Sequence, residues 1–278
     1  MFIVNFNQFV YALFILCLIS TGSTAHAELG TRFKVGAGYA HYDLDVGEDT
    51  SSQPLGFTHS LPYGTAEIVV HGDQLFLSAS YLQTTEGDIE QEPFGQTLMG
   101  PGTRSGDFKH NQLRVKLGYR IVNTFSLYLG YERSLSELSY AFEFPKAGDN
   151  NPSLNPGDQF NLNAQYEFST SGPLLGMNYA FTPKEAPLYL SLNLDVSELD
   201  GKLENTNNQA LINGTDSGSA DNTDSTLTDR SAVATRVGLN LTYRFTQGQT
   251  VKTNIEVQNK DFGFNSENIY FAGVEYGF

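Results

Sequence analysis

The final nine residues of the chain, 270 to 278, read YFAGVEYGF. The even-numbered positions of this segment are all apolar or aromatic, whereas the odd-numbered ones include two glycines and a glutamate. Because successive side chains of a β-strand point to opposite faces, this alternation predicts a strand with one apolar face. The same period of two recurs through 31–42, 108–122, 187–198 and 231–245. The chain is therefore expected to be an all-β protein.

Composition narrows the class of protein further. The 278 residues include 27 glycines, 15 tyrosines and 20 phenylalanines, and the formal net charge is −15. Many turns and aromatic residues suit a protein of many strands, and the acidic balance disfavours a nucleic-acid partner. A chain of this length can hold two domains, but all-β barrels also reach it as one. We expect a single domain over 28–278.

The first 27 residues are expected to form a signal peptide. An apolar run over 9–19 is followed by small and polar residues and then by Ala25-His26-Ala27, which fits cleavage after Ala27. The segment before the run has no Lys or Arg, unlike a typical signal. A transmembrane anchor is the alternative, although such a helix needs about 18–20 apolar residues. Cys17 is the one cysteine, so its removal with the signal leaves no disulfide or thiol chemistry.

The spacing of the strands favours a membrane barrel over a soluble β-sandwich. Connections expected to be short alternate with long ones: 71–74, 122–124, 182–187 and 246–250 against 44–59, 84–106, 145–158 and 200–229. Short periplasmic turns and long external loops give outer-membrane barrels this rhythm. A soluble periplasmic β-protein remains the alternative.

Aromatic residues on the apolar faces are expected to form two belts at the membrane interfaces. One set falls beside the short turns and the termini: Phe33, Tyr119, Phe125, Phe181, Tyr243, Phe245, Tyr276 and Phe278. The other set falls near the opposite ends of the strands: Tyr39, Tyr81, Tyr131 and Tyr270.

The last strand ends on Phe278, with the aromatic Tyr276 two places before it. This ending resembles the C-terminal assembly signal of bacterial outer-membrane β-barrel proteins, and with the signal peptide the resemblance covers nearly the whole chain. It implies a transmembrane antiparallel up-and-down β-barrel in the outer membrane of a Gram-negative bacterium. It also implies contact with outer-membrane lipids and lipopolysaccharide, and recognition by the barrel-assembly machinery. The resemblance identifies no subfamily.

Ten strands are expected, an even number as bacterial barrels require: 31–42, 60–71, 74–84, 108–122, 124–144, 159–181, 187–198, 231–245, 250–259 and 267–278. Twelve or eight strands are the alternatives. Apolar residues change parity within 124–144 and 159–181, which predicts β-bulges and an outward hairpin. That hairpin would expose aromatic residues to a partner: Tyr140, Phe142, Phe144, Phe160, Tyr166 and Phe168.

The alternation also assigns charged residues to the lumen. The expected cations are Arg32, Lys34, Arg114, Lys116, Arg120, Arg236, Arg244 and Lys252, and the expected anions are Glu67, Glu132, Asp195, Glu256 and Glu275. The remaining charge, strongly acidic, falls on loops and strand ends. A barrel of about eight strands leaves room only for side chains, so these charges are expected to pair across a closed lumen. A small anion-preferring, porin-like channel is the alternative.

Two acidic stretches, 43–49 and 203–228, match no calcium-binding loop, so neither a metal nor a cofactor is predicted. The barrel class includes omptin proteases and lipid-modifying hydrolases, and His41, His59 and His110 fall near external strand ends. No Asp-x-His or His-x-Ser pair lies on a strand, and therefore no catalytic residue is predicted. We expect a non-enzymatic surface, structural or interaction protein with long acidic extracellular loops. An outer-membrane hydrolase with a rim histidine is a further alternative.

Overall fold

The computed structural model describes residues 30–48, 54–97, 100–143, 159–182, 186–212, 222–245, 249–261 and 266–278. Its strands are β1 (Gly30–Glu48), β2 (Pro54–His71), β3 (Leu75–Thr84), β4 (Gly87–Thr97), β5 (Gly100–Val122), β6 (Phe125–Glu143), β7 (Gln159–Ala180), β8 (Leu188–Ile212), β9 (Asn222–Arg244), β10 (Thr250–Asp261) and β11 (Ser266–Gly277). The expected signal peptide, with Ala25 and Ala27, lies outside the described residues. In the described ranges, no helix is long and apolar enough to span a membrane.

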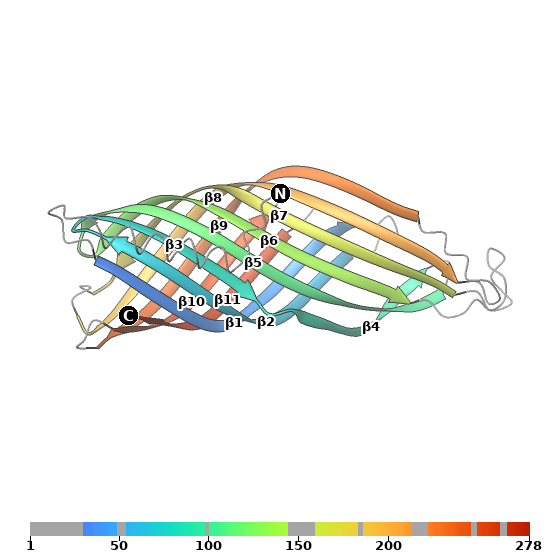
Figure 1. The fold of residues 1–278 in the computed structure, drawn as a ribbon, viewed down its shortest axis with the longest axis horizontal. Helices are drawn as coiled ribbons and strands as arrows, with labels where there is room; N and C mark the ends of the chain where they lie inside the picture. Colours follow the sequence, from blue (N-terminus) through green and yellow to red (C-terminus); the bar gives the residue numbers. More distant parts are fainter. Residues whose placement is uncertain are drawn as a thin grey trace.

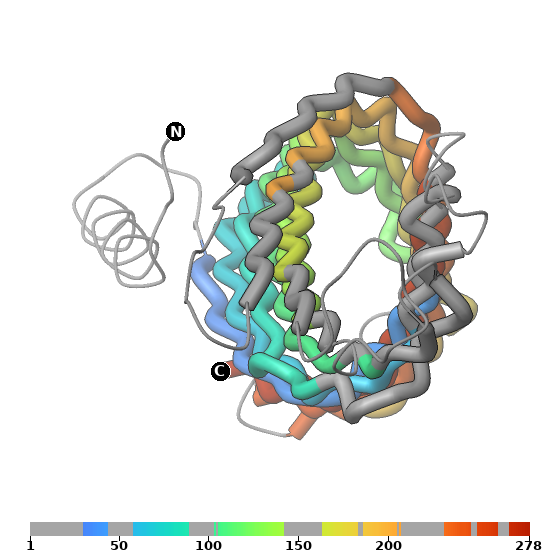
Figure 2. Tube along the Cα trace, turned by 90° about the vertical axis from the view of Figure 1, so that its right-hand side faces the viewer, coloured from blue at the N-terminus to red at the C-terminus, as the bar shows by residue number. Residues whose placement is uncertain are grey.

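The strands close into one antiparallel barrel. Each strand pairs with its neighbours in the order β3-β2-β1-β11-β10-β9-β8-β7-β6-β5, and β3 pairs with β5 to complete the circle. β4 pairs with β5 beyond the end of β3 and forms a short eleventh strand on the wall. The strands run steeply along a long cylinder (Figure 1), whose cross-section is oval (Figure 2). The expected ten-stranded barrel is confirmed.

The register between β6 and β7 is continuous. The pairs run without a shift from Phe125 opposite Tyr179 to Glu143 opposite Asn161. The prediction of β-bulges in these two strands is therefore wrong. Pro173 lies within this run, opposite Tyr131, and β7 keeps one register with β8 on both sides of it.

The apparent change of parity is a change of environment. In the first half of β6, next to the short turn that precedes it, Leu127 and Leu129 face outward and are exposed, as the lipid-facing side of a membrane strand requires. In the upper part, Leu138 and Tyr140 face the interior and are buried, while Glu137 faces outward. Outside the membrane the outer face meets water, so the apolar side chains move to the interior face.

An apolar core fills the part of the barrel away from the short turns, which is the part expected to be extracellular. Its largest fully buried members are Tyr42, Phe108, Leu61 and Ile269, and the rings of Tyr42 and Phe108 lie 4.9 Å apart. Tyr140, Tyr166 and Phe168 also face this interior and are at most 9% exposed. The expectation that they form an exposed hairpin surface is therefore wrong, because their side chains pack in the interior of the barrel. The side chains of Phe142 and Phe160, and all of Phe144, lie outside what the structure describes.

Several expected long loops are strands instead. β8 continues to Ile212 and β9 begins at Asn222, so much of the expected loop 200–229 is a paired hairpin. Similarly, β4 and the start of β5 occupy most of 84–106. These segments are polar because both strands leave the membrane, and that polarity concealed their strand structure.

The expected aromatic belts lie on the outward face. Tyr39, Tyr131 and Tyr270 are exposed toward the extracellular side, and Tyr119, Phe181 and Phe278 are exposed beside the short turns and the last strand end. Phe33 stacks on Phe278, with ring centroids 6.1 Å apart. The outer surface between the belts is apolar, which suits contact with hydrocarbon.

Candidate functional site

The lumen is the first place to look for function, because ten strands direct every second side chain into it. The central residue is Arg236 on β9, which is 4% exposed. Its Nη2 lies 3.0 Å from Glu132 on β6, its Nη1 lies 3.3 Å from Asp195 on β8, and its Nε lies 2.8 Å from Glu256 on β10. Nη2 also donates a hydrogen bond of 2.7 Å to the side-chain oxygen of Gln258. One guanidinium thus joins four strands across the interior.

Two cations of β5 extend this network to the opposite wall. Lys116 lies 3.1 Å from Asp195, and Arg114 lies 3.5 Å from Glu256. β5 and β10 are separated by half of the circle, so the contact between Arg114 and Glu256 crosses the full width of the barrel. Such cross-lumen pairs occupy the space that an ion would need.

The contact of Tyr128 with Asp195 depends on a glycine. The phenol of Tyr128 donates a hydrogen bond to Asp195, and Gly176 lies between their strands. A β-carbon at Gly176 would lie 2.3 Å from the Tyr128 ring and 2.5 Å from an Asp195 oxygen. The missing side chain therefore makes room for this part of the network.

Two further pairs lie between adjacent strands. Lys34 on β1 and Glu67 on β2 are 2.5 Å apart, and Lys252 on β10 and Glu275 on β11 are also 2.5 Å apart. Ten of the thirteen charges that the sequence assigned to the lumen therefore take part in ion pairs. The other three are Arg32, Arg120 and Arg244, at the ends of β1, β5 and β9 beside the short turns, which is the side expected to be periplasmic. Among the described residues, no carboxylate lies within 4 Å of their guanidiniums.

A second buried polar cluster lies beside the apolar core. Lys260 on β10 and Glu267 on β11 are 2.8 Å apart, and Lys260 donates a 3.0 Å hydrogen bond to Ser134. His110 Nδ1 lies 2.8 Å from the hydroxyl of Ser136, which also donates a 3.3 Å hydrogen bond to Glu267. Lys260 was not expected in the lumen because the predicted strand ended at residue 259, and Glu267 was not assigned there although it begins the last predicted strand. Continued alternation would have placed both inside.

The histidines near the external ends have different surroundings. His41 faces outward and contacts the Ser60 hydroxyl at 2.9 Å. His110 and Ser136 are 1% and 5% exposed, so this His-Ser-Glu arrangement has no access to substrate. Within the described residues, no group of three His, Cys, Asp or Glu side chains could hold a metal ion.

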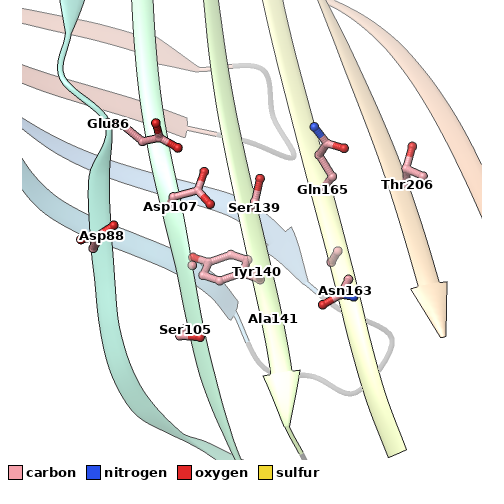
Figure 3. A pocket seen from close by; sticks show the side chains of 12 residues that line it. Glu86, Asp88, Ser105, Asp107, Ser139, Tyr140, Ala141, Asn163, Gln165 and Thr206 are labelled. Carbon is pink, nitrogen blue, oxygen red and sulfur yellow. The ribbon is translucent and has the colours of Figure 1, made fainter. Parts of the chain in front are cut away.

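A groove of about 580 Å³ lies on the outer face of the extracellular wall (Figure 3). Side chains from β4 through β8, together with Glu86 just before β4, line it. The polar groups are three carboxylates, two amides and three hydroxyls: Glu86, Asp88, Asp107, Asn163, Gln165, Ser105, Ser139 and Thr206. The groove can offer many hydrogen bonds and a negative charge to a ligand.

Carboxylates face one another directly across the strands around this groove. Asp88 is opposite Asp107, and Glu167 lies between Glu137 and Glu204 in one row across β6, β7 and β8. Burial raises the pKa of Glu167, and its neighbours Glu137 and Glu204 raise it further. Like charges at directly opposed positions destabilise a sheet. The acidic character expected for external loops thus belongs in large part to the strand wall.

No family model and no curated protein sequence matches this chain. Among solved structures, the outer membrane protease OmpT from Escherichia coli aligns with 93% of this chain and 100% of its own, with a TM-score of 0.53 and 11% identity. The chain folds as an outer-membrane β-barrel.

Other outer-membrane barrels align less closely. The toluene transporter TodX from Pseudomonas putida covers 89% of this chain and 89% of its own, with a TM-score of 0.40 and 12% identity. The attachment invasion locus protein Ail of Yersinia pestis covers 89% and 98%, with a TM-score of 0.35 and 9% identity. At 11% identity, the similarity of this chain to OmpT shows a shared fold and no shared activity. Any activity has to be argued from the residues of this chain.

Proposed function

We propose that this protein is a non-conducting barrel of the Gram-negative outer membrane that serves as a non-enzymatic surface interaction protein. The observation that carries the proposal is the lumen filled by Arg236 and the carboxylates of Glu132, Asp195 and Glu256. A conducting pore keeps a continuous aqueous path, and a barrel of this size has little space beyond its own side chains. The apolar core above this network adds a second barrier.

Planar-bilayer conductance tests the closed lumen. The mature chain is refolded in detergent, and a band that shifts on heating in a gel shows that it has folded. We expect no current steps from the wild-type protein. A variant with Arg236→Ala, Glu132→Ala and Glu256→Ala removes the centre of the network and is expected to give steps or excess current noise. Reproducible discrete steps from the wild-type barrel contradict the proposal and support the anion channel.

Catalysis finds less support than interaction. The Ser136, His110 and Glu267 cluster is sealed inside the barrel, whereas hydrolysis needs a nucleophile that substrate can reach. His41 is exposed, and its Nδ1 contacts the hydroxyl of Ser60, which also lies on the outer face of the wall. These arrangements favour structural roles for both histidines.

The extracellular wall is the surface that a partner would meet. Its groove and the opposed carboxylates around it favour a cationic partner, since positive charge would relieve the repulsion between Glu137, Glu167 and Glu204. Lys109 already pairs with Glu137 at 2.8 Å, and its hydrogen bond to this carboxylate raises the pKa of the Lys109 amine.

A lysine-rich peptide of about ten residues can serve as the probe of this wall. Calorimetric titration of the folded barrel is expected to show binding that weakens with added salt. The variant Glu137→Gln/Glu167→Gln/Glu204→Gln should lose most of the affinity. A control with the same change of charge, Asp43→Asn/Glu198→Gln/Asp200→Asn, should lose little. Equal losses in both variants would mean that only the net charge of the protein matters.

A further inference from the structure

The periplasmic mouth of the barrel differs from the rest of the lumen in its charge balance. Arg32, Arg120 and Arg244 take interior positions at the ends of β1, β5 and β9. The other lumen cations named above have carboxylates 2.5 to 3.5 Å away. In the described part of the chain, these three arginines have none within 4 Å. None of these three positive charges thus has an ion-pair partner among the described residues.

The three strands are spread around the circle. In the pairing order, β1 and β9 are three strands apart, β9 and β5 four, and β5 and β1 three. Ten strands spaced about 4.8 Å apart and tilted by roughly 40° enclose a radius of about 10 Å. A long arginine side chain covers most of that radius, so three inward guanidiniums can converge on a ligand near the axis.

Arg120 has a donor group at this mouth that makes no hydrogen bond with the described residues. The Nε of Arg120 is buried and has no hydrogen-bond partner among the described residues, and its Nη1 makes one long contact of 3.5 Å with the backbone oxygen of Asp73. His71 ends β2 at the same mouth. Partial burial lowers the pKa of His71, and the positive charges of Arg32 and Arg120 lower it further. The local field at the mouth is therefore positive.

We propose that the periplasmic mouth is a phosphate-binding site formed by Arg32, Arg120 and Arg244. A guanidinium presents its N–H groups in a planar fork that suits the oxygens of phosphate and carboxylate. One fork satisfies a carboxylate, whereas a phosphate dianion has two negative charges and four oxygens that three guanidiniums can share. The phosphate can be a soluble ion or ester in the periplasm, or the headgroup of a phospholipid in the inner leaflet.

Titration of the refolded full-length mature barrel with inorganic phosphate tests the site. In zwitterionic detergent at low salt, we expect saturable binding detected by calorimetry. The variant Arg32→Gln/Arg244→Gln should bind at least ten times more weakly, because two of the three forks are lost. Arg133→Gln/Lys202→Gln is the matched control, since it removes the same number of positive charges from exposed outward positions away from this mouth, and it should bind like the wild type. Each variant must first show the heat-dependent gel shift of a folded barrel.

Lipid nanodiscs distinguish the two sources of phosphate. If phosphatidylglycerol in the nanodisc weakens binding of inorganic phosphate relative to phosphatidylcholine, the headgroup occupies the site. If both lipids give the same affinity, the site takes a soluble phosphate. Either result supports the site, provided that Arg32→Gln/Arg244→Gln abolishes the effect. Absence of saturable binding, or equal affinity of this variant and the wild type, overturns the proposal.

Discussion

Arg236 is buried and contacts three carboxylates, and this makes it the residue on which the closed lumen most depends. Removing one partner of a buried ion pair leaves uncompensated charge and typically costs about 3–5 kcal/mol. Arg236→Met is therefore expected to lower the free energy of unfolding by about 3 kcal/mol. Urea titration followed by circular dichroism in detergent measures the change.

Arg133→Met is the control for that substitution, because Arg133 is a neighbour of Glu132 but faces outward and is exposed. An exposed charge contributes at most about 1 kcal/mol. Equal effects of the two substitutions would show that Arg236 is not the centre of the network.

The row of opposed glutamates predicts a pH-dependent effect. The pKa of Glu167 is raised, so the folded state disfavours its charged form, and stability is lost as the pH rises through this pKa. Glu167→Gln should therefore raise the temperature of the gel-band shift at pH 7 and change it little near pH 4. A rise of the same size at both pH values would exclude charge repulsion as the cause.

Alternation along single strands was enough to place individual residues on a face. It assigned Arg236, Glu132 and Asp195 to the interior. Asp195 and Arg236 are directly opposed on the neighbouring strands β8 and β9, but Arg236 meets Glu132 on β6 only across the closed lumen, and alternation along single strands cannot predict that contact. It also failed at strand ends. The expected strand stopped at residue 259, one residue before Lys260, and Glu267, the first residue of the last expected strand, was not assigned to the lumen.

At the scale of the strand, β6 and β7 carry apolar side chains outward in the membrane and inward above it. The sequence contains both halves of this pattern, but it does not say whether the register or the surroundings change between them. A β-bulge and a change of surroundings from lipid to water produce the same shift in the positions of the apolar residues. The pairing of β6 with β7 has no register shift, so the surroundings change and the register does not.

The extracellular core should behave like the core of a soluble protein. Phe108 is fully buried, and truncation of a buried phenylalanine costs about 3–5 kcal/mol. In Phe108→Ala, the upper strands are expected to become sensitive to trypsin at sites such as Lys109 and Lys202, while the lipid-embedded part stays protected. Mass spectrometry of the digested, detergent-solubilised protein locates the cuts.

Leu129→Ala is the comparison for this substitution, since Leu129 faces outward below Tyr131 and is 63% exposed. It should leave the trypsin pattern unchanged. If both variants are cut at the same sites and rates, the apolar core has no special part in holding the upper strands.

At the scale of the whole molecule, ten strands and closure follow from repeated alternation, short turns and the even-number rule. The short strand β4 was not expected, because bulges and Pro93 interrupt its pattern. The groove beside it could not be foreseen either, since five consecutive strands of the wall create it only after they pair.

The terminal strand predicts how the molecule is assembled. The backbone groups of Phe278 and Phe33 exchange hydrogen bonds of 2.9 and 3.0 Å where the first and last barrel strands meet. Phe278→Ala should reduce the amount of folded barrel in the outer membrane of growing cells severalfold, whereas Phe245→Ala, which removes an exposed ring from the residue that follows β9, should not. The heat-shifted band in membrane fractions measures both, and equal yields would remove Phe278 from the assembly signal.

The inversion of polarity along the strands also fixes the bilayer thickness that this barrel tolerates. Glu137 and Glu167 face outward six residues along their strands from the paired residues Tyr131 and Pro173, the level of the upper aromatic belt. In a thicker bilayer, hydrophobic mismatch would bring these carboxylates toward hydrocarbon, at a cost that increases with each ångström. The bacterial outer membrane is thinner than most membranes. The barrel should therefore fold faster and more completely in short-chain than in long-chain phosphatidylcholine.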